Sequence, residues 1–406
     1  MKIYLALPVL NESANLPALL ENLKDQSFGN FELFVCVNQP NHYWDDPAGR
    51  AICRDNRKSM ELLQGQKSFR IHLIDRSSAG NAWKGKHFGV GWARKTLMDA
   101  INQEAGKDDL IISIDADTFY PPEYLDSVIE VFEGFPTAHG LANPYYHPLS
   151  GDENIDKAIL HYEIYMRNYN INMLLIDNPY SFTALGSAMS VPVWAYRKVG
   201  GITPHKSGED FYFLQKLRKS GDLLSWNRIP VFPSARASDR VFFGTGPAII
   251  RGLKNDWQSY PVYHHRFFEE IKEVYENFFS LYTDEMDSPV IEFLKDHLKD
   301  PDFLKPLRGN ASSPASFSKA MFRKIDALRI LQYLKHRQLS LAMNNTEALT
   351  ENILHFGLAE SIDHKQIRQA GDLLILDPLI LRSIRDELFN LESMLQQKSQ
   401  SRRQFS

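Results

Sequence analysis

Residues 111–118, Ile111-Ile112-Ser113-Ile114-Asp115-Ala116-Asp117-Thr118, run from an apolar segment into two carboxylates. Two carboxylates separated by one residue at a strand end can approach a single cation, because the chain is leaving the pleat there. Mg2+ and Mn2+ prefer such oxygen ligands. The competing interpretation is a capped corner, in which Asp117 or Thr118 caps a helix that has Pro121-Pro122 in its first turn. The local sequence leaves both interpretations open.

The chain around this stretch alternates short apolar runs with helical patterns throughout its first half. This alternation is typical of a mainly parallel sheet covered by crossover helices. Strands are expected at 3–8, 32–38, 70–75, 110–115 and 139–144. Helices are expected near 14–26, 47–64, 90–105 and 122–133. The sequence therefore predicts an α/β fold with a doubly wound, Rossmann-like sheet.

Polar residues stand at the ends of the first four expected strands. Sheets of this kind bind ligands outside the carboxyl ends of their strands, so these residues are the first candidates for a site. The four ends are Asn11-Glu12, Asn38-Gln39, Asp75-Arg76-Ser77 and Asp115-Ala116-Asp117. Polar residues also cap helices at such corners, so each end alone is weak evidence for a site.

The second half of the chain has a different pattern. Beyond about residue 252 the strand signals fade, and apolar residues recur at helical spacing. We expect an α/β domain over 1–250, a helical domain over 251–396 and a disordered polar tail over 397–406. One basic amphipathic helix is expected over 317–339. It could lie on an anionic membrane, although docking on its own domain is the favoured interpretation.

Composition and charge exclude several classes of protein. Hydrophobic residues make up 43% of the chain and charged residues 24%, which is ordinary for a soluble globular protein. The formal net charge is -4 with both signs interspersed, which argues against a nucleic-acid partner. Two cysteines without a metal-type spacing indicate a reducing compartment, hence the cytoplasm. No apolar run is long enough to span a membrane, so any membrane contact is expected to be peripheral, at the inner face.

An ordered series of motifs surrounds the two carboxylates. The series comprises Leu7-Pro8, Asn11-Glu12, Asn15-Leu16, Gly89-Val90-Gly91-Trp92-Ala93-Arg94-Lys95, Gly186-Ser187-Ala188-Met189, Arg197-Lys198-Val199-Gly200-Gly201 and Gly208-Glu209-Asp210. In this order and spacing, residues 1–245 resemble the family 2 glycosyltransferases, and the helical remainder does not. The resemblance implies a GT-A fold and an enzyme of the hexosyltransferase type. It implies transfer of a sugar from a nucleotide-diphosphate sugar to an acceptor hydroxyl, in glycan, polysaccharide or glycolipid biosynthesis, with inversion by single displacement.

The resemblance also implies roles for four carboxylates. A divalent metal, Mn2+ or Mg2+, would be held at Asp115 and Asp117 and would stabilise the charge that develops on the diphosphate. By the same resemblance, Asp117 corresponds to the residue that binds the metal directly. Asp115 would lie nearer the ribose or the waters of the metal. Asp210 resembles the base that accepts the hydroxyl proton, with Glu209 as its substitute. The competing interpretation of Glu209-Asp210 is the acid-rich first turn of a helix.

Further residues are expected to bind the donor. Pro8, Asn11 and Glu12 would face the nucleotide, with a simple helix cap at Asn11 as the alternative. The second strand of the family usually ends in acidic residues, whereas this chain has Val37-Asn38-Gln39-Pro40. An amide of Asn38 or Gln39 could still read a base edge, and Asp75 could share that role. The base itself is not determined.

Basic residues are expected at the diphosphate. The segment from Gly85 to Arg94 is rich in glycine and basic residues, and it could wrap a diphosphate. Arg236 and Arg240 could clamp phosphate bidentately. An equally weighted alternative is that these two arginines form a surface pair with Asp239 or solvent.

Other functions compete with this hypothesis. A nucleotidyltransferase of related fold also holds metal with carboxylates, but it leaves Glu209-Asp210 without a role. Haloacid-type phosphatases use an Asp-x-Asp followed by Thr or Val two residues later, where this chain has Phe119. A non-catalytic nucleotide-sugar-binding or scaffold protein is the third alternative. The acceptor (glycan, lipid-linked or small molecule), the donor sugar and the oligomeric state are not determined by the sequence.

Overall fold

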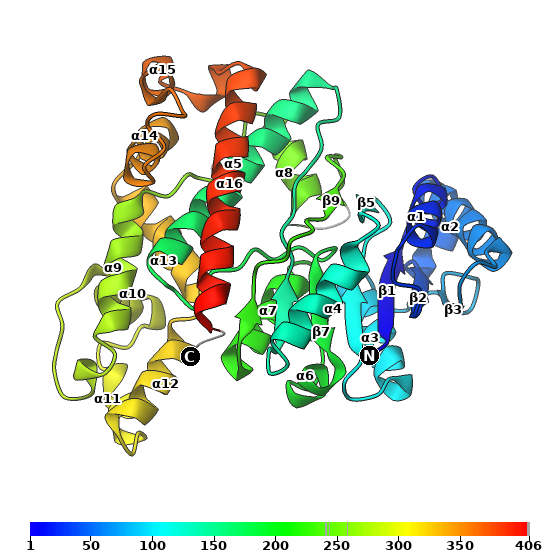
Figure 1. Cartoon of the computed structure of the whole chain (residues 1–406), viewed down its shortest axis with the longest axis horizontal. Helices are drawn as coiled ribbons and strands as arrows, with labels where there is room; N and C mark the ends of the chain where they lie inside the picture. The colour runs from blue at the N-terminus through cyan, green and yellow to red at the C-terminus, as the bar shows by residue number, and fades with distance from the viewer. Residues whose placement is uncertain (240–241, 243, 258, 404–406) are drawn as a thin grey trace. The chain divides into compact units, whose positions relative to one another are not determined.

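The computed structural model describes residues 1–239, 242, 244–257 and 259–403 of the chain (Figure 1). It divides into two compact units. The first comprises 1–159, 182–254 and 396–406, and the second comprises 160–181 and 255–395. Helices α5 (Glu153–Leu175) and α16 (Pro378–Arg403) contribute residues to both units. The second unit thus takes up a stretch of chain that the sequence predicts to belong to the α/β domain.

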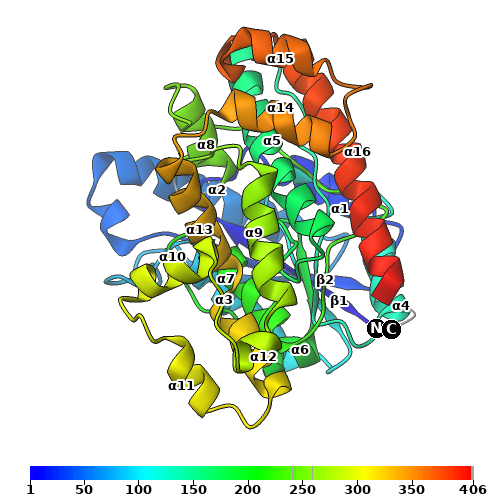
Figure 2. The same ribbon diagram turned by 90° about the vertical axis from the view of Figure 1, so that its left-hand side faces the viewer.

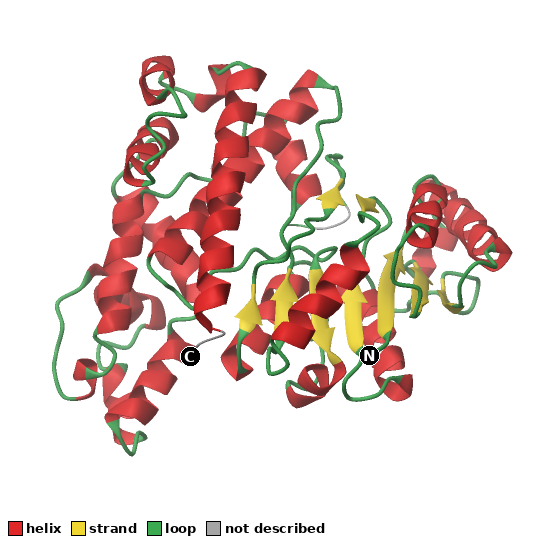
Figure 3. Cartoon of the chain, viewed as in Figure 1, coloured by secondary structure: helices red, strands yellow, loops and turns green. Residues whose placement is uncertain are grey.

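A seven-stranded sheet forms the centre of the first unit, in the order β3-β2-β1-β4-β7-β6-β8 (Figure 3). Strand β1 (Ile3–Val9) is flanked by β2 (Phe31–Asn38) and β4 (Leu110–Ser113), and β2 by β3 (Ile71–Arg76). All three pairings are parallel. The apolar runs of β1, β2 and β4 are largely buried, as the central strands of a parallel sheet require, whereas β3, at the edge of the sheet, is only half-buried.

The far side of the sheet is less regular. Strand β7 (Met189–Pro192) pairs antiparallel with both β4 and β6 (Gly140–Ala142), and β8 (Leu223–Leu224) pairs parallel with β6. The predicted α/β class with a mainly parallel sheet is confirmed. The antiparallel strand β7 was not expected, because four residues show too little periodicity to distinguish a strand.

Helices connect the strands where the sequence predicts them. The first unit contains α1 (Leu16–Lys24), η1 (Asn41–Trp44), α2 (Pro47–Gly65), α3 (Val90–Glu104), α4 (Tyr124–Gly134), α6 (Val193–Lys198), α7 (Glu209–Ser220) and α8 (Thr245–Gly252). Helix α2 shows why helix boundaries of this kind can be predicted from the sequence. Pro47 occupies its first turn, and the Asp46 carboxylate accepts a hydrogen bond from the Gly49 N–H.

A second, two-stranded sheet matters for the site. Strand β5 (Thr118–Phe119) pairs antiparallel with β9 (Phe232–Pro233). Thr118 stands opposite Pro233, and the Ser234 N–H donates to the Asp117 carbonyl at 2.9 Å. This short pairing brings the segment that follows β9 against the two carboxylates that follow β4.

The second unit is helical. Besides parts of α5 and α16, it contains α9 (His265–Glu276), η2 (Ser280–Tyr282), α10 (Pro289–Leu298), α11 (Leu304–Gly309), α12 (Pro314–Lys324), α13 (Ala327–Ser340), α14 (Asn345–His355), α15 (His364–Ala370) and η3 (Leu373–Ile375) (Figure 2). None of the helices in the described part of the chain combines the length and the apolar character needed to cross a bilayer.

The single amphipathic helix predicted over 317–339 is wrong. The segment forms α12 and α13, because Asp326 starts a new helix by accepting a hydrogen bond from the Arg329 N–H. The apolar face of α12, with Phe317 and Met321, is buried. Docking on its own domain, the interpretation favoured from the sequence, agrees with this burial.

The polar tail also differs from its description as disordered. Helix α16 continues to Arg403, and 404–406 lie outside the described residues. The Gln400 side-chain oxygen accepts a hydrogen bond from the Trp226 N–H at 3.2 Å, and an Arg403 guanidinium nitrogen donates to the Leu223 carbonyl at 2.9 Å. Within the first unit, the last turn of α16 is therefore attached beside β8.

Buried ion pairs join α5 to α16 inside the second unit. The Arg167 guanidinium contacts Glu163 at 3.2 Å and Glu392 at 2.6 Å. Asn170 donates to the other Glu392 oxygen at 2.7 Å, and Arg385 contacts Glu163 at 3.1 Å. Burial raises the pKa of Glu392, while Arg167 opposes that rise. Such a network stabilises only while each charge keeps its partners.

Replacing Glu392 with leucine should lower the free energy of unfolding by about 3–5 kcal/mol, because the buried Arg167 loses one of its two carboxylates. Urea unfolding followed by circular dichroism measures this change. The matched control is Asn390→Ala, an exposed position on the same helix, which should change stability by less than about 0.5 kcal/mol. Equal stability of both variants would contradict the role of the pair.

Candidate functional site

Among the described residues, the carboxyl edge of the sheet brings two arginines against the acidic residues Glu12, Asp115, Asp117 and Glu209, all within the first unit. Asp115 and Asp117 follow β4, and Glu12 follows β1. Glu209 is the first residue of α7. Of the two arginines, Arg94 lies on α3 and Arg236 lies in the segment after β9. Segments far apart in sequence thus meet at one edge, as expected for ligands at a doubly wound sheet.

Arg94 forms the fixed link of this edge. Its Nε donates to Ser113 Oγ at 3.1 Å, and one terminal nitrogen donates to Asp115 Oδ1 at 2.6 Å. The other terminal nitrogen is paired with Glu209 Oε1. Only 3% of the residue is exposed. This arrangement favours a positioning role for Arg94 over the contact with a diphosphate that the sequence predicts.

Glycine makes room for this guanidinium. A Cβ added at Gly186 would lie 2.2 Å from Arg94 Nη2, closer than any real contact. Gly91, one turn before Arg94, also permits a close approach, since a Cβ there would lie 2.1 Å from the His205 carbonyl oxygen. Both glycines belong to the motifs that carry the family resemblance, and here they have a steric reason.

Tyr120 anchors the corner that carries Asp115 through hydrogen bonds of its hydroxyl group. The Asp115 N–H donates to the Tyr120 hydroxyl at 3.0 Å, and that hydroxyl donates to the Ser187 carbonyl at 3.1 Å. Thr118 lies in β5, and α4 begins at Tyr124 with no side-chain cap. The capped-corner interpretation of Asp117 and Thr118 is therefore wrong.

Arg236 forms a second bridge between carboxylates. Its Nε contacts Asp117 Oδ2 at 2.6 Å, and a terminal nitrogen is paired with Glu12 Oε1. The other Glu12 oxygen accepts a hydrogen bond from Asn15 Nδ2 at 2.5 Å. The partners of Arg236 in the structure are the carboxylates of Asp117 and Glu12, whereas the sequence predicts phosphate, Asp239 or solvent. Arg240, the second predicted phosphate ligand, lies outside the described residues.

Glu209 and Asp210 occupy the first turn of α7, so the helix-start interpretation describes their position correctly. Burial raises the pKa of Glu209 to about 7 and also raises the pKa of Asp210, and Arg94 opposes both shifts. Asp210 Oδ1 accepts a hydrogen bond from the Phe211 N–H at 2.8 Å. Glu209 is 2% exposed and engaged by Arg94, whereas Asp210 is half-buried. A carboxyl group with a raised pKa is suited to accept a proton.

The predicted base-reading amides are engaged inside the protein. Asn38 Nδ2 donates to the Val9 carbonyl at 2.9 Å. The Gln39 amide donates to Cys53 Sγ at 2.8 Å and accepts from Asn56 Nδ2 at 2.7 Å. Both residues are buried. Their amides therefore hold the carboxyl ends of β1 and β2 in place, and recognition of a base by either one stays a prediction.

The remaining predicted donor residues lie along the same edge but outside the two arginine bridges. Pro8 stands beside Cys36 on β2, and the Asn11 N–H donates to Asn56 Oδ1 at 2.9 Å. Asp75 accepts hydrogen bonds from Asn81 and from the N–H groups of Ser77 and Ser78. Although burial opposes the shift, these bonds lower the pKa of Asp75. Asp75 thus organises the loop that follows β3.

The chemistry of Asp115 and Asp117 fits a hard divalent cation. Both are carboxylates at one strand end, with side chains 32% and 21% exposed. Among the described residues, Asp115 and Asp117 have no third metal-ligating side chain clustered with them. Mg2+ and Mn2+ commonly complete such sites with water and with phosphate oxygens of the substrate, so two carboxylates suffice. The donor set therefore fits the implied metal.

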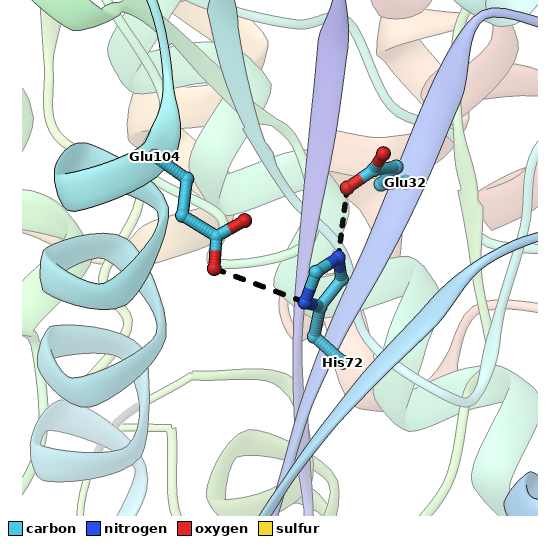
Figure 4. A group of neighbouring side chains, drawn as sticks. All are labelled: Glu32, His72 and Glu104. Carbon is cyan, nitrogen blue, oxygen red and sulfur yellow. Dashed lines mark hydrogen bonds and ion pairs between the residues drawn. The ribbon is translucent and has the colours of Figure 1, made fainter.

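A separate cluster of potential ligands, Glu32, His72 and Glu104, lies at the amino ends of β2 and β3 (Figure 4). His72 Nε2 is 2.7 Å from Glu32 Oε2, and His72 Nδ1 is 3.9 Å from Glu104 Oε1. Lys2 also contacts Glu32 at 2.5 Å, and Arg70 contacts it at 3.4 Å. Two cations already balance this carboxylate, so we assign the cluster to joining β2, β3 and α3.

Comparisons with known proteins give distant likenesses. No protein-family model matches the chain. An uncharacterized glycosyltransferase of Haemophilus influenzae is 23% identical over 212 residues, which are 52% of this chain and 60% of that protein. The match thus spans less than two thirds of the relative.

Two solved structures also align with the chain. TarS 1-349 of S. aureus, in complex with UDP-GlcNAc, is 13% identical, with 80% of this chain and 90% of that chain covered and a TM-score of 0.41. The mannosyltransferase PcManGT of Pyrobaculum calidifontis, in complex with GDP-Man and Mn2+, is 11% identical, with 97% and 87% covered and a TM-score of 0.39.

Replacing Gly186 with alanine should displace the Arg94 guanidinium and lower stability by about 1–3 kcal/mol, as overpacking of a tight site does. A double-mutant cycle with Arg94→Ala, measured by urea unfolding, tests the cause. In the Arg94→Ala background the same glycine change should cost much less, because the clash is gone. Gly65→Ala, where an added Cβ meets nothing within 4 Å, is the control. Strictly additive losses would contradict the steric account.

Proposed function

We propose that this chain is a glycosyltransferase of family 2 with the GT-A fold, which moves a sugar from a nucleotide-diphosphate sugar to an acceptor hydroxyl. One observation carries the proposal. The buried Arg94 connects Asp115, two residues before Asp117, to Glu209, which directly precedes Asp210 at the start of α7. Carboxylates able to hold a divalent metal and a carboxylate able to accept a proton therefore share one edge. The H. influenzae relative, called an uncharacterized glycosyltransferase, supports the same activity class.

Asp117 and Asp115 would hold a divalent metal, Mn2+ or Mg2+, in this proposal. When bound, such a metal would supply Lewis-acid stabilisation of the negative charge that develops on the diphosphate leaving group. The protein's part is to fix the two carboxylates. Tyr120 anchors the backbone at Asp115, and Arg94 orients its side chain. Glu12, Pro8 and Asn11 are proposed to face the nucleotide from the neighbouring strand.

Asp210 is proposed as the general base. Glu209 is buried and engaged by Arg94, which suits an orienting role, whereas Asp210 is half-buried and beside it. Asp210 would accept the proton of the acceptor hydroxyl as the new bond to the sugar forms. The carboxylates proposed to hold the metal follow β4, and the proposed general base lies on α7. This separation is compatible with single displacement and inversion.

The alternatives explain this arrangement less well. A nucleotidyltransferase would need the carboxylates after β4, but it would leave the half-buried Asp210 without a task. A non-catalytic binding protein would have no need to keep a carboxyl group with a raised pKa at the site. The proposed acceptor remains a glycan, a lipid-linked sugar or a small molecule. We propose that the α/β domain of 1–250 carries the reaction, with the helical region as an accessory.

Replacing Asp210 with asparagine should reduce sugar transfer by about 10²- to 10⁴-fold, because the base is lost. The donor is first identified by a thermal-shift screen of nucleotide-sugars with Mn2+, since a specific ligand stabilises the folded chain. Donor hydrolysis and transfer are then measured. Donor affinity should stay within a few-fold, and Asp222→Asn, which changes an exposed acidic residue just beyond the other end of α7, should be nearly neutral. A wild-type chain that binds no nucleotide-sugar would contradict the proposal.

The reaction should depend on pH through Asp210. Burial raises the pKa of Asp210 above its ordinary 3.8, so kcat/KM for donor hydrolysis should rise with pH along an acidic limb centred above that value. Arg94 lowers the pKa of Asp210, so Arg94→Met should move this limb to higher pH in the remaining activity. Arg228→Met, which removes a surface cation, should leave it in place. A limb that moves to lower pH in Arg94→Met would refute the assignment.

A further inference from the structure

We propose that Arg236 is an exchangeable counter-ion, which occupies Asp117 and Glu12 until a nucleoside diphosphate and a divalent metal arrive together. The inference rests on the proposed function, which it deepens by naming what controls loading of the metal. Its consequence is that metal and nucleotide bind cooperatively, and that metal alone binds weakly. Removing Arg236 should weaken this cooperativity, because a cation that competes with the metal for Asp117 is then absent before the nucleotide arrives.

The geometry puts a cation where a metal ligand is needed. Arg236 Nε contacts Asp117 Oδ2 at 2.6 Å, and a terminal nitrogen is paired with Glu12 Oε1. A divalent cation bound by the same Asp117 oxygen would face the guanidinium charge at close range, where like charges repel strongly. The arginine and the metal therefore compete for Asp117.

The two arginines at this edge differ in how firmly they are held. The Arg94 side chain is 4% exposed, bound also to Ser113, and enclosed by Gly186. The Arg236 side chain is 33% exposed and stands in irregular chain after the two-residue strand β9. A side chain with a third of its surface in solvent can change its rotamer without opening the core. Arg94 is thus a fixed support, and Arg236 is able to move.

A nucleoside diphosphate can supply both a new partner for Arg236 and further oxygen ligands for the metal. Its phosphate oxygens offer Arg236 a new bidentate partner of the kind that guanidinium groups prefer. The same diphosphate supplies further oxygens for the metal, which Asp115 and Asp117 need because they do not form a ready three-ligand group among the described residues. The released Asp117 oxygen and the new phosphate oxygens then become available together.

Coupling of this kind is reciprocal, so the nucleotide should raise the affinity for metal by the factor by which metal raises the affinity for nucleotide. Replacing Arg236 with alanine removes a cation that competes with the metal for Asp117. We expect the affinity for Mn2+ alone to increase about tenfold, which is a common size for a coupling between two ligands. Affinity for the nucleotide should fall, and the coupling factor should shrink accordingly.

The experiment titrates Mn2+ into the full chain by electron paramagnetic resonance, without nucleotide and then with UDP or GDP. Arg228→Ala is the matched control, because it also removes one positive charge from an ion pair of the same unit, with Glu130 at 2.9 Å. Asp117→Asn in the Arg236→Ala background should abolish the gained Mn2+ affinity and so assign the site. If Arg236→Ala does not fold, Arg236→Gln keeps the stem and removes the charge.

Tighter binding of Mn2+ alone in Arg236→Ala but not in Arg228→Ala, with a smaller coupling factor, would support the inference. Unchanged or weaker binding of Mn2+ alone would overturn it, and so would an unchanged coupling factor. Failure of the proposed function has a different signature, namely a wild-type chain that binds no nucleotide-sugar with any metal. The titration without nucleotide does not depend on that result.

Discussion

The contacts of Arg94 are the interaction on which the carboxyl edge depends. A guanidinium that is 3% exposed must keep its charge paired, since an unpaired buried charge is very costly. Its partners come from the end of β4 and from the start of α7. The central sheet and the helix that begins at Glu209 are therefore held in one arrangement. Gly186 permits the guanidinium to lie there, and Tyr120 fixes the corner that carries Asp115.

Much of the fold could be predicted because local sequence determines it. The apolar runs before Asp75 and before Asp115 are too short for helices, and each is followed by a polar corner, which is the pattern expected of strands in a parallel sheet. Caps such as Asp46 with Pro47 give the helix boundaries directly. Since the carboxyl ends of parallel strands meet at one edge, the candidate site residues could be gathered without a structure.

The rest depends on contacts between distant segments. Strands β5 and β9 have two residues each, so they carry no periodicity, and only their pairing brings Arg236 to Asp117. The break between α12 and α13 rests on one capping residue, Asp326, inside a continuous apolar pattern. The sequence indicates that Arg94 and Arg236 are available cations, but it cannot say whether their partners are phosphates or carboxylates. The amide of Gln39 likewise suits a base edge until its internal partners are known.

The proposed function gives a reason for the difference between the two arginines. Glu12, Asp115, Asp117 and Glu209 would repel one another at a single edge if no cation lay between them. Two permanently buried arginines would satisfy that requirement, but they would also prevent a metal from reaching Asp117. Arginines that were both exposed would leave the corner after β4 loosely positioned. In the proposed site, one fixed and one exchangeable cation would meet both demands, since the first would set the geometry and the second would neutralise charge only while the substrate is absent.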